Sequence, residues 1–230
     1  MPGTRRAYSN GGYVIAQQLM MDVTGLPFAE FMAETVLEPA GMWQSTFEVP
    51  LPDRMKGNVA RGHWPDGQTI AGGWRTYPEM GSGASLWSTP SDLARFGVEI
   101  MHAYNGNPDA LLSPETARTM LTRQTPGSAA AYGLGFGFGE DGSRRFYFIH
   151  DGGTEGYRCV MAMYPELGRG AVIMTNGHVG DGLWREILNS ISAEYGLVQD
   201  LTLVYTAVVL GLGAAGVAVF VWRRRRRSNG

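Results

Sequence analysis

Residues 132–175 read YGLGFGFGEDGSRRFYFIHDGGTEGYRCVMAMYPELGRGAVIMT, and this stretch decides the fold. β-Branched and aromatic residues gather in four runs that are separated by short glycine-containing segments, a pattern typical of strands joined by tight turns. The predicted strands are Tyr132 to Phe138, Arg145 to Ile149, Tyr157 to Tyr164 and Gly170 to Thr175. Because the connections are short, we expect neighbouring strands to pair as antiparallel hairpins.

Helices are predicted on both sides of this stretch, from apolar spacing and from capping residues such as Thr89 and Gly25. The predicted helices are Tyr13 to Thr24, Pro27 to Leu37, Leu93 to Ala103, a short helix after Ser113, and Gly182 to Tyr195. Residues 50–80 are rich in glycine, proline and isolated aromatics, which predicts a long irregular excursion or a few short strands. Helices grouped before and after an antiparallel sheet predict the α+β class.

Charge and cysteine content exclude several kinds of protein. The chain has 230 residues with 19 basic and 21 acidic side chains, and five of the basic ones are the arginines at 223–227. The remainder is therefore acidic, which argues against a nucleic-acid-binding surface. The single cysteine, Cys159, cannot form an internal disulfide and lies in an apolar run, where a small buried hydrophobe is the favoured interpretation.

The C-terminal residues 201–222 contain no charged side chain. As a helix they would span about 33 Å, close to the thickness of a bilayer core. The arginines that follow favour a cytoplasmic C-terminus. We therefore expect a globular part (1–196) held outside the cytoplasm at the cell membrane, a single transmembrane helix (201–222) in contact with lipid, and a basic cytoplasmic tail (223–230). Small residues at 207, 211 and 215 would also permit weak pairing of two such helices.

Three local features combine residue types used in catalysis: Tyr8-Ser9-Asn10, Gly81-Ser82-Gly83, and His150-Asp151-Gly152-Gly153. Each one alone is also compatible with ordinary turn chemistry. No second histidine, cysteine or acid stands beside His150 at a metal-ligand spacing, so neither a metal nor a cofactor is predicted.

Taken in order, these features and several others resemble the C-terminal portion of the serine β-lactamase and penicillin-binding-protein-like family, in its branch of class C β-lactamases, D-aminopeptidases and esterases. The matching segments are Pro2 to Thr4, Tyr8 to Asn10, Leu37 to Met42, Gly83 to Thr89, Asp92 to Phe96, Tyr132 to Gly135, His150 to Gly153, and Gly156-Tyr157. The resemblance covers about Pro2 to Tyr195 and implies a partial β-lactamase/transpeptidase-like fold.

The resemblance also implies roles for particular residues. In the family a Ser-x-x-Lys, a Tyr-x-Asn and a Lys-Thr-Gly or His-x-Gly element meet in one cleft. Tyr8 would then move the proton of the serine, Asn10 would hold the substrate amide or the lysine, and His150 would stand in the third element. Gly152 and Gly153 would bind substrate, with the Gly153 N–H directed at the oxyanion. The reaction would be acyl transfer through a covalent acyl-enzyme.

The sequence departs from the family pattern in two respects. Its only lysine, Lys56, is preceded three residues earlier by Asp53, so no Ser-x-x-Lys is present. No secretory signal opens the chain either, and both features predict a fragment that is inactive by itself. Histidine in the third element is mostly neutral near pH 7, which favours ester or D-peptide substrates over β-lactams. The alternative is a degenerate module that binds cell-wall peptide or a partner protein.

Overall fold

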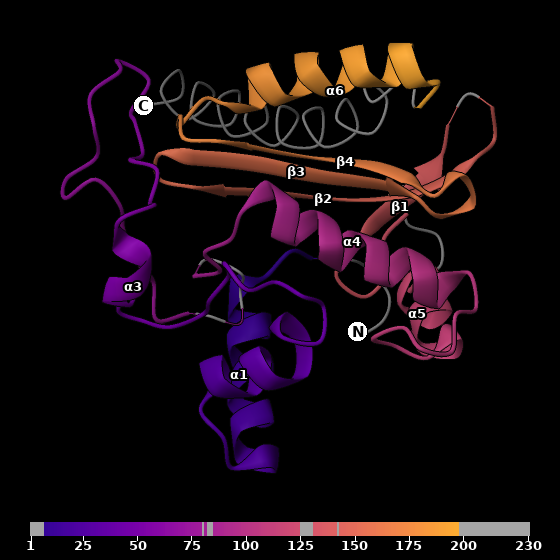
Figure 1. Ribbon diagram of the computed structural model, residues 1–230, viewed down its shortest axis with the longest axis horizontal. Coiled ribbons are helices and arrows are strands. Elements are labelled where there is room, and N and C mark those ends of the chain that lie inside the picture. The colour runs from indigo at the N-terminus through magenta and orange to yellow at the C-terminus, as the bar shows by residue number, and fades with distance from the viewer. Residues whose placement is uncertain (1–6, 80, 82–84, 125–130, 142, 198–230) are drawn as a thin grey trace, which may run out of the picture.

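The computed structural model describes residues 7–79, 81, 85–124, 131–141 and 143–197. Its centre is a four-stranded antiparallel sheet in the order β1-β2-β3-β4. The strands are β1 (Gly137–Glu140), β2 (Phe146–Thr154), β3 (Tyr157–Tyr164) and β4 (Arg169–Thr175). Helix α6 (Asp181–Tyr195) covers one face and α4 (Pro90–Tyr104) crosses the other (Figure 1). The predicted α+β arrangement with an antiparallel sheet is confirmed.

Two apolar clusters attach these helices to the sheet. On one face the buried side chains of Trp184 and Leu188 from α6 pack against Ile149 and Val160. On the other face Met101 of α4 packs with Phe148, Met161 and Met163, and Gly97 lets α4 approach Met163 closely. Side chains alternate along each strand, so the odd-numbered residues of β2 face α6 and the even-numbered ones face α4.

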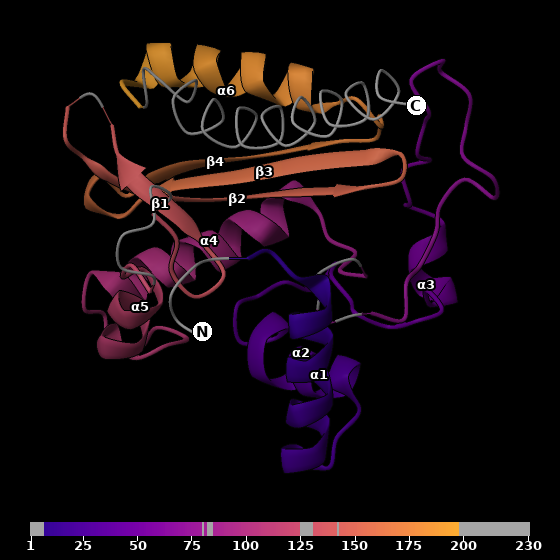
Figure 2. The same ribbon diagram turned by 180° about the vertical axis from the view of Figure 1, so that it is seen from behind.

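The N-terminal helices form a separate group below the α4 side of the sheet (Figure 2). This group consists of α1 (Asn10–Thr24), α2 (Phe28–Met32) and the π-helix η1 (Ala33–Leu37). Helix α1 ends at Gly25, whose φ of 71° is the left-handed conformation that its sequence position predicts. The short helix α5 (Pro114–Met120) begins at the predicted Ser113 cap, and α4 begins at Thr89, whose hydroxyl accepts a hydrogen bond from Asp92 N at 3.2 Å.

Residues 50–79, the described part of the segment 50–80, are an irregular excursion, as predicted, apart from the single-turn helix α3 (Asp53–Lys56) and isolated bridges. A 3-10 turn, η3 (Pro165–Leu167), joins β3 to β4.

Two predicted strands differ from the observed strands by several residues. The first strand begins at Gly137 rather than Tyr132, because residues 132–136 form a turn in which Gly133 N donates to Phe136 O at 2.8 Å and Gly135 has a φ of 90°. The second strand does not end at Ile149 but continues through His150 to Thr154. The glycines that indicated a turn after His150 instead lie within the strand.

The predicted transmembrane helix is also corrected. Among residues 7–197, as far as they are described, no helix is both long and apolar enough to cross a membrane. The run on which the prediction rested, 201–222, and the basic tail 223–230 lie outside the described residues. The fold class is therefore stated as α+β, without a transmembrane helix.

Candidate active site

Tyr8 and Asn10 lie at the start of α1. Ser9 is the cap: its backbone is extended, and its hydroxyl accepts a hydrogen bond from Gly12 N at 3.1 Å. Asn10 is the first helical residue and is exposed, and Tyr8 is 66% exposed. The cap therefore fixes the backbone between two solvent-facing side chains whose polar groups are open to a ligand.

His150, Gly152 and Gly153 lie on the last part of β2, where one edge of the strand is open. Strand β1 pairs only with Phe146 to Ile149, whereas β3 pairs with β2 as far as Thr154. Within the described residues, no strand pairs with 150–154 on the β1 side. Such an edge presents backbone N–H and C=O groups to which an extended peptide can add as a further strand.

A short series of contacts links α1 to this open edge. A Cβ built on Gly135 would lie 3.8 Å from the hydroxyl oxygen of Tyr13 on α1. The next residue, Phe136, places its ring 6.2 Å from that of His150, at an interplanar angle of 87°. The turn before β1 thus connects the two segments that carry the predicted catalytic residues.

The Gly81 turn is attached to the same helix. The side-chain oxygen of Gln17 on α1 accepts a hydrogen bond from Gly81 N at 2.7 Å. A third segment singled out in the sequence therefore lies beside α1, and its other two residues, Ser82 and Gly83, fall outside the described part of the chain.

Gly152 is packed tightly against the neighbouring strand. It is paired with Cys159 of β3, and a Cβ on Gly152 would lie 2.7 Å from the Cys159 sulfur. Burial, and to a lesser degree the charge of Asp151, raises the pKa of the Cys159 thiol. The thiol is therefore protonated near neutral pH and fills space beneath the strand, in keeping with the predicted role as a small hydrophobe.

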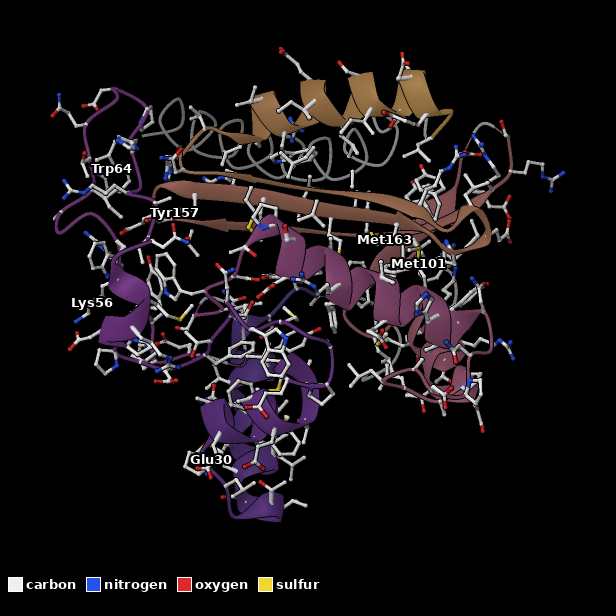
Figure 3. All side chains as sticks on the ribbon, viewed as in Figure 1. Glu30, Lys56, Trp64, Met101, Tyr157 and Met163 are labelled. Atoms are coloured by element: carbon white, nitrogen blue, oxygen red, sulfur yellow. The ribbon has the colours of Figure 1, made fainter. Side chains whose placement is uncertain are left out.

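The irregular segment 50–79 contacts the turn end of the β2–β3 hairpin. The hydroxyl of Tyr157 donates to Ala60 O at 2.7 Å and to Gly73 O at 3.2 Å, and its ring packs edge-on against Trp87 at 5.7 Å. An ion pair between Arg75 and Glu155 ties the excursion to the turn. Figure 3 shows Tyr157 and Trp64 at this end of the sheet.

The contacts of Tyr157 and Arg75 with distant parts of the chain were not predicted from the sequence. Tyr157 belongs to the Gly156-Tyr157 motif, and nothing in its local pattern predicts partners 84 and 97 residues away in the chain. The one available signal was the length of the excursion, since long irregular loops often support a site.

Lys56 does not enter the candidate site. It lies on α3, where its ammonium group pairs with Asp53 at 2.6 Å, and Figure 3 shows it far along the molecule from the sheet centre. Among the described side chains there is also no cluster of three or more histidine, cysteine, aspartate or glutamate residues that would hold a metal.

Solved structures define the class of fold. A penicillin-binding protein homologue from Pyrococcus abyssi superposes with a TM-score of 0.69 at 21% identity, covering 91% of this chain and 47% of that one. A class C β-lactamase superposes with a TM-score of 0.64 at 16% identity, covering 76% and 53% of the two chains. The chain therefore has part of the fold of the penicillin-binding proteins and class C β-lactamases.

Sequence comparison gives the family. A model described as Beta-lactamase matches residues 1–189, and the chain belongs to this family. A D-alanyl-D-alanine-carboxypeptidase/endopeptidase from Escherichia coli is 27% identical over 184 residues, which is 75% of this chain and 46% of the relative. A D-aminopeptidase from Brucella canis is 30% identical over 163 residues, which is 69% of this chain and 29% of the relative. The chain thus spans about half, or less, of the length of the curated relatives it matches.

Proposed function

We propose that this chain forms the C-terminal part of a serine hydrolase that cleaves amide or ester bonds through an acyl-enzyme. The observation that carries the proposal is the open edge of β2 at residues 150–154, connected through Phe136 and Gly135 to the exposed start of α1. A substrate acyl chain lying along this edge would have His150 and the Gly153 N–H at its reacting carbonyl.

The proposed chemistry requires a serine from outside the described residues. Its hydroxyl attacks the carbonyl carbon while Tyr8 accepts the proton, and the proton then passes to the departing amine or alkoxide. The Gly153 N–H donates to the oxyanion that forms on the carbonyl oxygen, and Asn10 orients the acyl amide. Water then attacks the acyl carbon of the acyl-serine while Tyr8 accepts its proton, and this proton passes to the serine oxygen as the acid is released.

His150 bears on the substrate class. A lysine at this position would be a permanent cation, whereas histidine is mostly neutral near pH 7 and acts through hydrogen bonds. We therefore rank short esters and D-amino-acid peptides above β-lactams. The names of two relatives, a D-alanyl-D-alanine-carboxypeptidase/endopeptidase and a D-aminopeptidase, support D-amino-acid peptides in particular.

The test uses two forms of the protein. The protein translated from an upstream-extended reading frame is assayed on a short aryl ester, a D-amino-acid peptide and a cephalosporin, and its acyl-enzyme is detected by intact mass. We expect turnover of the ester or the peptide to exceed that of the cephalosporin, and faster cephalosporin turnover would reverse the ranking. The 230-residue chain alone is expected to give no fluorophosphonate adduct, and an adduct on Ser9 would contradict the assigned roles.

The same test separates the second candidate function. A degenerate module that only binds cell-wall peptide or a partner protein would form no acyl-enzyme in either form of the protein. Its upstream reading frame would also lack a Ser-x-x-Lys. The location outside the cytoplasm stays a prediction.

A further inference from the structure

Phe136 lies opposite His150, one position beyond the paired part of β1. The last register pair at this end of the two strands is Gly137 with Ile149, so the next position along brings Phe136 beside His150. The two rings lie 6.2 Å apart at an interplanar angle of 87°, which is an edge-to-face arrangement. Cross-strand neighbours at this spacing restrict each other's side chains. The Phe136 ring is therefore a direct neighbour of the imidazole, on the face of the sheet that α4 crosses.

The Phe136 ring is itself held firmly. It is buried, and it forms a second edge-to-face contact with the ring of Phe148, at 5.2 Å and 73°. Phe148 is fully buried in the cluster that attaches α4 to the sheet. A ring packed in this way cannot turn aside without opening a void in the cluster.

The backbone that carries Phe136 is fixed to the end of α5. Leu134 N donates to Met120 O at 2.8 Å, and a Cβ built on Gly133 would collide with the same oxygen. Gly133 N in turn donates to Phe136 O at 2.8 Å. The turn 133–136 therefore has a defined position relative to α5, and Phe136 presents a rigid surface to its neighbours.

The side chain of His150, in contrast, is exposed. An exposed side chain populates several rotamers, and ordering it during a reaction costs free energy. A group that must donate or accept a hydrogen bond at a reacting carbonyl works best when a packed neighbour has already fixed its rotamer. Among the described side chains, the Phe136 ring is well placed to provide this support.

We propose that Phe136 is a positioning residue that holds the imidazole of His150 in the orientation used in acyl transfer. Phe136 acts through His150 and not on the substrate. The inference rests on the proposed function for its kinetic consequence, because it takes His150 as the group at the reacting carbonyl. Its structural consequence, a single orientation of the His150 side chain that depends on Phe136, does not require turnover.

The structural consequence is tested on the 230-residue chain by NMR. The three-bond couplings between Hα and the two Hβ protons of His150 report whether the side chain occupies one rotamer or several. We expect couplings typical of a single rotamer in the unaltered chain and averaged, intermediate couplings in Phe136→Leu. Averaged couplings in the unaltered chain, or unchanged couplings in Phe136→Leu, would overturn the inference.

Phe138→Leu is the matched control. Phe138 lies on β1 two residues further along, packs against the same cluster, and places its ring 5.9 Å from that of Phe146. Its replacement removes a ring of the same kind from the same cluster, so the couplings of His150 should stay as in the unaltered chain. An equal change in the two variants would indicate a general loosening of the sheet and would count against the inference. Urea denaturation checks that each variant folds, and Phe136→Met replaces Phe136→Leu if the latter does not.

The kinetic consequence is tested on the extended protein with the short aryl ester. Phe136→Leu is expected to lower kcat/KM by about 10-fold to 100-fold, the size of effect that a small misplacement of a reacting group produces. In a His150→Ala background the same substitution should change kcat/KM by no more than about 2-fold, because the group through which Phe136 acts is gone. Equal losses in the two backgrounds would show a merely structural role and overturn the inference.

Failure of the proposed function would look different from failure of this inference. An extended protein that forms no acyl-enzyme would refute the proposed function. The couplings in the 230-residue chain would still decide whether Phe136 orients His150: a change confined to Phe136→Leu would support it, and no change would refute it.

Discussion

Gly152→Ala is the substitution whose outcome the structure defines most sharply. The new methyl carbon would lie 2.7 Å from the Cys159 sulfur, whereas non-bonded carbon atoms settle at roughly 3.5–4.0 Å. The overlap is therefore about 1 Å across a paired position of the sheet. Gly152 lies between β3 and the open edge, so relief would require either a rotation of the thiol or a displacement of β2 away from β3.

Overpacking of this size in a packed interior costs about 1–3 kcal/mol of unfolding free energy. The substitution also offsets part of this cost, since glycine in a strand is less favourable than alanine by roughly 0.5–1 kcal/mol. We therefore expect a net loss of about 1–2 kcal/mol for Gly152→Ala. Cys159→Ala removes the colliding atom, so the double variant should be more stable than the sum of the two single changes predicts, by about 1 kcal/mol or more.

Urea denaturation of the chain gives these values from the midpoint and the slope of each transition. Gly57→Ala is the control, because a Cβ at Gly57 would meet nothing within 4 Å and its φ of −70° suits any residue. The reasoning is refuted if Gly152→Ala is as stable as the control, or if Cys159→Ala gives no relief.

Three further substitutions test the contacts of Tyr157, the cap of α4 and the ion pair of Asp141. Tyr157→Phe removes the hydrogen bonds to Ala60 O and Gly73 O but keeps the ring beside Trp87. The free energy of local opening in residues 58–75 should therefore fall by about 1–2 kcal/mol, which is measured as faster amide hydrogen exchange. Unchanged exchange in these residues would show that the hydrogen bonds of Tyr157 do not stabilise the segment. Thr89→Ala removes the cap of α4 and should cost about 0.5–2 kcal/mol in urea denaturation, whereas Thr89→Ser should cost little; equal losses would exclude capping as the cause. Burial raises the pKa of Asp141, but hydrogen bonds from Arg145 and Ser143 outweigh this and lower it overall, so its contribution is present above the ordinary value of about 3.9 and is lost as the pH falls through the folded-state value. Asp141→Asn should therefore lower the free energy of unfolding at pH 7 and reduce the loss of that free energy as the pH is lowered, measured by urea denaturation at several pH values. An unchanged loss of stability at acid pH would contradict this assignment.

The helices were predictable because their ends are set by local chemistry. Ser113 and Thr89 cap helices where their spacing to proline and to an acid indicated, and Gly25 ends α1 in the left-handed conformation. These signals depend on a few neighbouring residues, so they do not require knowledge of the rest of the fold.

The strand ends were less predictable, since cross-strand packing determines them. Gly152 and Gly153 look like turn residues in the sequence, but they lie within β2 because Cys159 and Arg158 of the paired strand occupy the space beside them. Conversely, the aromatic residues after Tyr132 look like a strand, but Gly133 and Gly135 bend them into a turn.

The candidate site was only partly accessible to sequence reasoning. Tyr8, Asn10 and His150 came from a family motif, whereas the role proposed for Phe136 follows only from the place of its ring opposite His150. The hydrogen bonds from Tyr157 to the backbone oxygens of residues 60 and 73 join distant parts of the chain, which no local pattern indicates.

The central claim, that Tyr8 at the start of α1 takes the proton in acyl transfer, is tested most directly by the acylation rate of the extended protein. Tyr8→Phe is compared with Tyr195→Phe, a tyrosine of similar exposure (66% and 60%) at the far end of α6. We expect Tyr8→Phe to slow acylation by about 10²-fold to 10⁴-fold, the usual contribution of a general base, and Tyr195→Phe to acylate at the rate of the unaltered protein. Equal acylation rates for the two variants would contradict it.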